Sequence, residues 1–234
     1  MATFHLQAGA VTPALEAEEP AEREAVLDAY YGTALPLLTQ ATGGLEVLHA
    51  SAVLVPSVDG VFAFCGTPGS GKSTIAYGLA TRGHAHWADD TVAFRTAGSQ
   101  QVHAVGLPFI AKLRENSSAY FDAALDASIS DSHEDREVPL DGVFLLDPTE
   151  STELGSPSLT RLAPAEALRA LLDNSFRFRP SDPERRDASM RSYLDLVASI
   201  PILRVRYPRG FDHLPDLLAA LERAMRGRHG GPPR

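Results

Sequence analysis

The residues with the clearest chemistry form one glycine-rich octapeptide in the first third of the chain. Its sequence is Gly66-Thr67-Pro68-Gly69-Ser70-Gly71-Lys72-Ser73. It matches the phosphate-binding pattern of glycine, any four residues, glycine, lysine and then serine or threonine. The glycines let the loop wrap so that its amide N–H groups point at phosphate oxygens. Lys72 is expected to neutralise charge on the β- and γ-phosphates, and the Ser73 hydroxyl to coordinate Mg²⁺. The pattern therefore predicts a site for a nucleoside triphosphate, ATP, with Mg²⁺.

The elements around this loop are the ones that the motif requires. The apolar run Val61–Cys65 predicts a strand before it, and Lys72–Thr81 predicts a helix after it whose positive end faces the bound anion. The run Leu45–Val55, followed by a turn at 57–60, predicts a hairpin with the strand that leads into the loop. In this context an accidental match is improbable, since the pattern alone is expected in about one chain in a thousand of this composition.

Two adjacent carboxylates, Asp89 and Asp90, follow Lys72 at about the length of one helix and one turn. One carboxylate of such a pair can hold Mg²⁺, and the other can accept the proton of an attacking hydroxyl. An Asp-Asp pair alone is more often a solvated turn, but behind a phosphate loop it favours phosphoryl transfer. The guanine-reading Asn-Lys-x-Asp element is excluded, because neither Lys72 nor Lys112 follows an asparagine.

Three stretches together resemble the catalytic domain of the HPr kinase/phosphorylase family. They are Leu48–Val55 with its His49, the phosphate loop, and Arg82-Gly83-His84 leading into Ala88-Asp89-Asp90. The resemblance implies a compact phosphate-loop domain with a mixed sheet, also seen in phosphoenolpyruvate carboxykinases. It further implies that Asp89 is the catalytic base toward the acceptor hydroxyl and that Asp90 assists Ser73 with Mg²⁺. His49 would stand close to the reacting phosphates.

The chain also departs from that family. The family usually has glutamate where this chain has Thr74, which we include among the nucleotide-binding residues. Only forty-eight residues precede His49, whereas the family carries a substantial N-terminal domain there. Short relatives of this type resemble kinases of peptide-modification clusters, including those that phosphorylate a lasso-peptide precursor on serine. The resemblance therefore implies a kinase whose acceptor is serine of a peptide or protein, with a homo-oligomer possible because the family forms ring-like hexamers.

Several alternatives remain open from the residues themselves. A regulatory nucleotide-binding module is the alternative to a kinase, and a small-molecule hydroxyl is the alternative acceptor. The paired aspartates favour the kinase, because a switch needs only one magnesium carboxylate. His84 and His86 lie near the carboxylates in a way that would also suit zinc, although magnesium chemistry explains this stretch more simply. The single cysteine, Cys65, is expected to be buried in the core.

Basic residues outside the motif form two groups. Lys112 and Arg114 either reach the phosphates from a neighbouring strand or lie at the surface. A second group either closes over the nucleotide or forms a solvated face; it comprises Arg177, Arg179, Arg185, Arg186 and Arg191. The acidic stretch Asp122–Glu137 predicts a mobile loop.

Composition bounds the class of protein. The 234 residues are 44% hydrophobic and 22% charged, which excludes collagen-like, low-complexity and wholly disordered proteins. The order of predicted strands and helices indicates an α/β fold with one mixed sheet flanked by helices. We expect a kinase domain over 45–225, an N-terminal extension of strand and helix over 1–44 packed on it, and a disordered tail over 226–234.

The net charge of −9 argues against a nucleic-acid partner, and a single cysteine excludes a disulfide framework. Without a signal sequence or a bilayer-spanning apolar run, a cytoplasmic location with no membrane contact is expected.

Apolar periodicity predicts the remaining elements. Helices are expected over Ala21–Leu38 (with Pro36 disturbing its end), Pro164–Leu172, Ala188–Ala198 and Leu214–Met225. Strands are expected over His86–Phe94, Gln101–Val105, Val143–Leu146 and Ile200–Tyr207.

Overall fold

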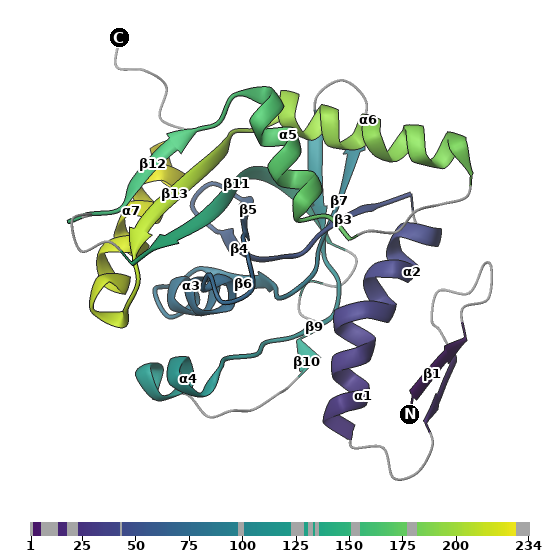
Figure 1. Ribbon diagram of the computed structural model, residues 1–234, viewed down its shortest axis with the longest axis horizontal. Coiled ribbons are helices and arrows are strands. Elements are labelled where there is room, and N and C mark those ends of the chain that lie inside the picture. Colours follow the sequence, from purple (N-terminus) through teal and green to yellow (C-terminus); the bar gives the residue numbers. More distant parts are fainter. Residues whose placement is uncertain are drawn as a thin grey trace.

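The computed structural model describes most of the chain as a mixed β-sheet flanked by helices (Figure 1). The described residues are 2–5, 14–17, 23–42, 44–97, 101–122, 129–130, 133, 136–150, 155–176 and 182–227. The predicted fold class, an α/β protein with one mixed sheet between helices, is confirmed. No helix of the described ranges is long and apolar enough to cross a membrane.

The sheet is organised around one long strand. In spatial order its main path is β3 (Glu46–Leu48), β7 (Val92–Ala97), β8 (Gln101–Val105), β11 (Glu137–Thr149), β5 (Gly60–Cys65), β4 (Ala50–Val55) and β6 (Ala85–Ala88). β13 (Ile202–Pro208) also pairs with β11, and β12 (Ser158–Arg161) pairs with β13. The first residues of β11 run antiparallel to β8, and the rest run parallel to β5 and β13. One strand therefore joins the two parts of the sheet and makes it mixed.

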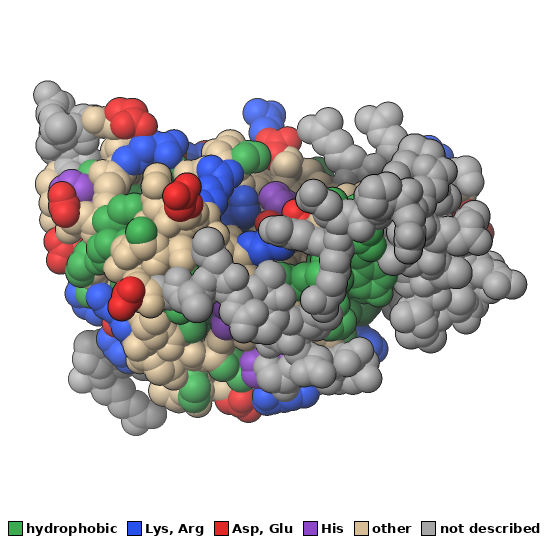
Figure 2. All heavy atoms as spheres, turned by 90° about the horizontal axis from the view of Figure 1, so that it is seen from below, with side chains coloured by type: hydrophobic (Ala, Val, Ile, Leu, Met, Phe, Trp, Pro, Cys, Tyr) green, Lys and Arg blue, Asp and Glu red, His purple; other side chains and the backbone are tan. Residues whose placement is uncertain are grey.

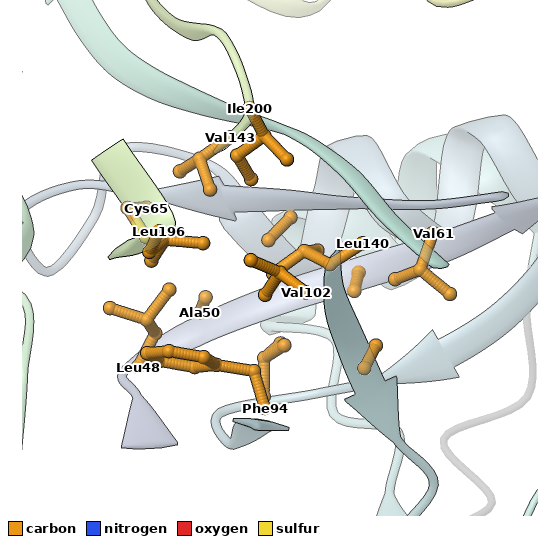
Figure 3. Close-up of a cluster of buried hydrophobic side chains, with 14 of the residues drawn as sticks. Leu48, Ala50, Val61, Cys65, Phe94, Val102, Leu140, Val143, Leu196 and Ile200 are labelled. Atoms are coloured by element: carbon orange, nitrogen blue, oxygen red, sulfur yellow. The ribbon is translucent and has the colours of Figure 1, made fainter. Parts of the chain in front are cut away.

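Side chains alternate between the two faces of the predicted hairpin β4–β5. Phe62 and Phe64 point to the face covered by α3 (Lys72–Ala80) and α7 (Leu214–Gly227). Val61 and Cys65 point to the other face, whose core α5 (Pro164–Asp173) and α6 (Pro183–Ser199) complete (Figure 3). This period of two is the one that a strand covered on both faces requires. Cys65 is buried as expected, and burial raises the pKa of its thiol to about 12.

The N-terminal part contributes a small hairpin and an irregular helical segment. β1 (Ala2–His5) pairs antiparallel with β2 (Ala14–Ala17). α1 (Arg23–Ala29), a π-helical turn η1 (Tyr30–Ala34) and α2 (Leu35–Thr42) then follow without a break. The segment continues past Pro36 to Thr42, beyond the predicted end. A proline inside an α-helix clashes with the carbonyl four residues before it, and a π turn at that point widens the backbone.

Several other elements differ from the sequence-based expectation. The run predicted over Leu45–Val55 is divided at His49 into β3, which pairs with β7, and β4, which forms the hairpin with β5. The stretch predicted as one strand over 86–94 is divided into β6 and β7, because Asp90 has a left-handed φ of 61° between them. The structure adds β9 (Phe109–Ile110), α4 (Glu115–Phe121), β10 (Ile129–Ser130) and the 3₁₀ turn η2 (Phe211–His213), none of which the sequence predicted. Most of the acidic stretch 122–137, and the tail 228–234, lie outside the described residues.

Candidate active site

The predicted phosphate loop connects β5 to α3, as its motif requires. Gly66 has a φ of 153°, and a Cβ there would lie 2.7 Å from the Ser70 hydroxyl oxygen and 3.1 Å from the Leu146 carbonyl oxygen. Only glycine fits that position. Gly71 precedes the first helical residue with a left-handed φ of 90°, another conformation that glycine adopts without strain. The Lys72 ammonium closes the loop by donating to the Gly66 carbonyl at 3.0 Å.

Three residues far away in the sequence fix the shape of this loop. The Tyr207 hydroxyl of β13 donates to the Ser70 carbonyl, and Arg209 Nη1 donates to the Gly69 carbonyl at 3.3 Å. Asn174, at the end of α5, accepts the Gly66 amide on its Oδ1 at 2.9 Å. None of these residues belongs to a motif, so no local signal in the sequence marks them.

Asp89 is buried against the loop and accepts hydrogen bonds from several donors. Its Oδ1 receives the Ser73 hydroxyl at 2.8 Å, the Ser51 hydroxyl at 2.5 Å and the Asp90 amide at 3.2 Å. Its Oδ2 receives the Lys112 amide at 3.1 Å. The carboxylate that touches the expected Mg²⁺ ligand Ser73 is therefore Asp89, whereas the sequence assigned the metal to Asp90.

Asp90 and His49 face the open side of the site. Asp90 has a left-handed φ of 61°, and its carbonyl lies 3.1 Å from His49 Nδ1. Burial, and then the charge of Asp89, raise the pKa of Asp90. Burial and then Lys72 lower the pKa of His49, and burial also lowers the pKa of Lys72. A carboxylate of raised pKa beside a neutral imidazole has the properties of a proton acceptor.

A cavity of about 660 Å³ opens over these groups. Pro68 to Thr74 of the loop, His49 and Asp90 line it, whereas Gly66, Thr67 and Asp89 are not part of its wall. Thr74 turns its hydroxyl to Ser117 of α4, 2.8 Å away. Four basic side chains also line the cavity: Lys72, Lys112, Arg114 and Arg209. In Figure 2 basic side chains gather with a histidine and acidic side chains around this hollow, in the upper middle of the view.

Two of these cations, Lys112 and Arg114, were predicted either to reach the phosphates or to lie at the surface. Lys112 and Arg114 both line the cavity, and whether they reach the phosphates stays a prediction. Lys112 also contacts the Asp28 carboxylate of α1, and an Arg114 nitrogen lies 3.9 Å from where a Cβ on Gly69 would stand. Arg209 lines the same cavity although nothing in the sequence singled it out.

The described part of the second basic group lies away from the cavity. Arg185 holds α6 to the N-terminal side of the sheet through the buried Glu46 carboxylate, 2.6 Å away, and the Gln40 and Leu45 carbonyls. Arg186 and Arg191 are exposed on α6. None of these three lines the cavity. Arg177 and Arg179 lie outside the described residues, so their predicted role is not addressed.

The two histidines considered for zinc contact different elements. His84 Nε2 lies 3.3 Å from the Glu222 carboxylate of α7, and the His86 ring packs on Phe109. Within the described ranges, no group of three histidine, cysteine, aspartate or glutamate side chains has an arrangement that would hold a metal.

The donor set fits Mg²⁺ with a polyphosphate better than a metal caged by protein ligands. Mg²⁺ keeps several waters and takes one or two carboxylates together with substrate phosphates. Ser73 and Asp89, in contact with each other at the start of α3, offer that arrangement. The Ser70 hydroxyl is buried without a partner among the described residues, so the loop retains an unsatisfied polar group.

Comparisons with known proteins give one structural similarity and no match in sequence. No protein family matches its sequence, and no curated protein matches it. Among solved structures it is similar to the Hpr(Ser) kinase/phosphatase from Coxiella burnetii, with 13% identity over 78% of this chain and 91% of that chain and a TM-score of 0.42. Similarity this low establishes neither a family nor an activity. The resemblance drawn from the motifs stays a prediction, and the function is argued from the site.

Proposed function

We propose that this chain is a kinase that transfers the γ-phosphoryl group of ATP to a hydroxyl, with serine of a peptide or protein as the acceptor. One observation carries the proposal. The phosphate loop and a pair of aspartates meet at one end of a cavity, where Asp89 touches Ser73 and Asp90 faces the open space. A module that only senses nucleotide has no need of the second carboxylate.

The chain's residues divide the reaction between them. Lys72 and the loop amides hold the phosphates, and Arg114 and Arg209 offset their remaining charge. Mg²⁺, held by Ser73 and Asp89, would supply charge neutralisation at the transferred group. Asp90 takes the proton of the acceptor hydroxyl. This division exchanges the roles that the family resemblance implied for Asp89 and Asp90. The hydrogen bond from Ser73 to Asp89 and the place of Asp90 in the cavity wall support it.

His49 acts on the base rather than on the phosphates in this scheme. Its ring nitrogen contacts the Asp90 carbonyl, and its own amide donates to the Asn174 carbonyl at 2.7 Å. Because Asn174 also holds the first amide of the phosphate loop, the histidine and the loop share one anchor. We assign His49 to positioning the acceptor side of the site.

The acceptor class is tested by competition between acceptors. The full chain is incubated with γ-labelled ATP, Mg²⁺ and two peptide libraries that differ only in having serine or alanine at a fixed position. The proposal expects label on the serine library and none on the alanine library. A parallel incubation contains small hydroxyl compounds in place of the libraries. Label on those compounds alone would replace the acceptor class, and label only in free phosphate would favour a nucleotide-binding module.

A further inference from the structure

The cavity has a second end that the proposed reaction does not use. Its lining includes the polar groups His49, Asp90 and Lys72, and also an apolar group formed by Phe211, Leu214 and Leu217, which we call the apolar end. An apolar wall has no task in holding phosphates or in moving a proton. The cavity is larger than those steps require, since its volume of about 660 Å³ lies within the range of sites that enclose a whole cofactor.

The apolar end is tied to the phosphate loop on both sides. On one side the Thr74 hydroxyl, in the first turn of α3, meets the Ser117 hydroxyl of α4. On the other side Arg209 donates to the Gly69 carbonyl two residues before η2 begins at Phe211. The two walls of the apolar end therefore have a defined position relative to the loop.

Phe211 presents a supported aromatic ring at this end. Its ring stacks on that of Tyr120 from α4, with centroids 4.6 Å apart and planes at 14°. The same side chain lines the cavity. A flat ring backed by a second ring and facing a cavity is suited to take a third planar group by offset stacking.

The direction of the phosphate chain selects the occupant. Lysine and serine of a phosphate loop mark the β- and γ-phosphate end of the nucleotide. Because Asp89 and Asp90 stand at that end, the α-phosphate and the nucleoside must extend away from them. Phe211, Leu214 and Leu217 of the apolar end carry no group that would bind a phosphate, so they suit the uncharged part of the nucleotide.

We propose that Phe211, Leu214 and Leu217 form the nucleobase subsite, with Phe211 as the ring on which the base of the nucleotide stacks. This inference rests on the proposed function, because it assumes a nucleotide on the phosphate loop. Stacking and apolar contact bind the face of the base, so inorganic tripolyphosphate, which has no base, cannot use them. Base–aromatic stacking typically changes affinity by about 5- to 150-fold when the aromatic side chain is truncated.

The test compares ATP with inorganic tripolyphosphate, each with Mg²⁺, by calorimetry on the full chain. Phe211→Ala is expected to weaken ATP by about 5- to 150-fold and tripolyphosphate by less than about twofold. Phe211→Tyr should bind ATP like the wild type, and Phe211→Leu, which keeps apolar bulk without a flat face, should fall between. Leu194→Ala, at an exposed position on α6, is the control and should change neither ligand.

The outcomes distinguish a failure of the nucleobase subsite from a failure of the proposed function. Equal losses for ATP and tripolyphosphate in Phe211→Ala, or no loss for either, would overturn the nucleobase subsite. Should the alanine variant fail to fold, the tyrosine and leucine variants carry the same comparison, and equal ATP affinity in both would overturn it as well. A wild-type chain that binds neither ligand would instead remove the proposed function.

Discussion

Replacing Asp90 by asparagine should stop phosphoryl transfer while leaving nucleotide binding almost unchanged. Asp90 lines the cavity, and burial together with Asp89 raises its pKa, which makes its carboxylate a stronger base than a free aspartate. Asparagine keeps the shape of the side chain and removes the proton acceptor. General-base catalysis is worth roughly 10²- to 10⁴-fold, which corresponds to about 2.7 to 5.4 kcal/mol of activation free energy.

Asp89→Asn is the matched variant and should behave differently. The Asp89 carboxylate accepts from Ser51, Ser73 and Lys112, and an amide group would turn a donor toward at least one of these donors. Asp89 is the proposed Mg²⁺ ligand. Losing a metal ligand that acts on both the ground state and the transition state lowers the binding affinity as well as the rate. We therefore expect the Mg²⁺ concentration for half-maximal activity to rise by at least about tenfold, with a loss of stability of about 1–3 kcal/mol.

The assay is a Mg²⁺ titration of ADP formation at saturating ATP for the wild type and both variants. Asp90→Asn should lower kcat by about 10²- to 10⁴-fold at an unchanged Mg²⁺ requirement. A wild-type kcat in Asp90→Asn would refute the assignment of the base. If Asp89→Asn alone lost kcat with an unchanged Mg²⁺ requirement, Asp89 would be the base, as the family resemblance implied.

Three further variants test the surroundings of the site. Gly66→Ala should abolish the thermal shift produced by ATP in scanning fluorimetry, because its methyl group would lie 2.7 Å from the Ser70 hydroxyl; an intact shift would show that the loop tolerates a side chain. Asn174→Ala should cost about 1–3 kcal/mol in urea unfolding and weaken ATP in calorimetry; unchanged ATP affinity would remove its link to the loop. Glu46→Ala should cost about 3–5 kcal/mol without altering the ATP affinity of folded protein, and Glu46→Leu combined with Arg185→Met should cost less; an equal or larger loss in the double variant would contradict the buried-pair argument.

Local pattern was sufficient to predict the scaffold of the site from the sequence. The hairpin, the loop and α3 are consecutive, and each depends on neighbouring residues: alternating apolar side chains, glycines at fixed spacing, and a helix that starts at Lys72. Those signals persist in the fold because tertiary packing reinforces them. The same holds for α5, α6 and α7, whose apolar periodicity predicted their central turns and left only their ends in error.

Local sequence pattern could not predict the residues that support the phosphate loop. Asn174, Tyr207 and Arg209 reach the loop across 108, 137 and 140 residues of sequence, and each is a single polar residue without a motif. The proposed division of roles between Asp89 and Asp90 could not be predicted either, because it rests on tertiary contacts. Asp89 contacts Ser73 and does not line the cavity, whereas Asp90 lines it, and adjacent letters in a sequence do not reveal that.

If this cavity transfers the γ-phosphoryl group of ATP to a serine hydroxyl, each ADP formed is matched by one phosphoserine. The most direct measurement is the ratio of ADP to phosphoserine formed by the wild-type chain and by Lys72→Ala, with a serine peptide, ATP and Mg²⁺. We expect one phosphoserine for each ADP in the wild type and neither product in Lys72→Ala, whose loop lacks the ammonium that would reach the phosphates. ADP formed without phosphoserine, or equal amounts of phosphoserine from both proteins, would contradict this expectation.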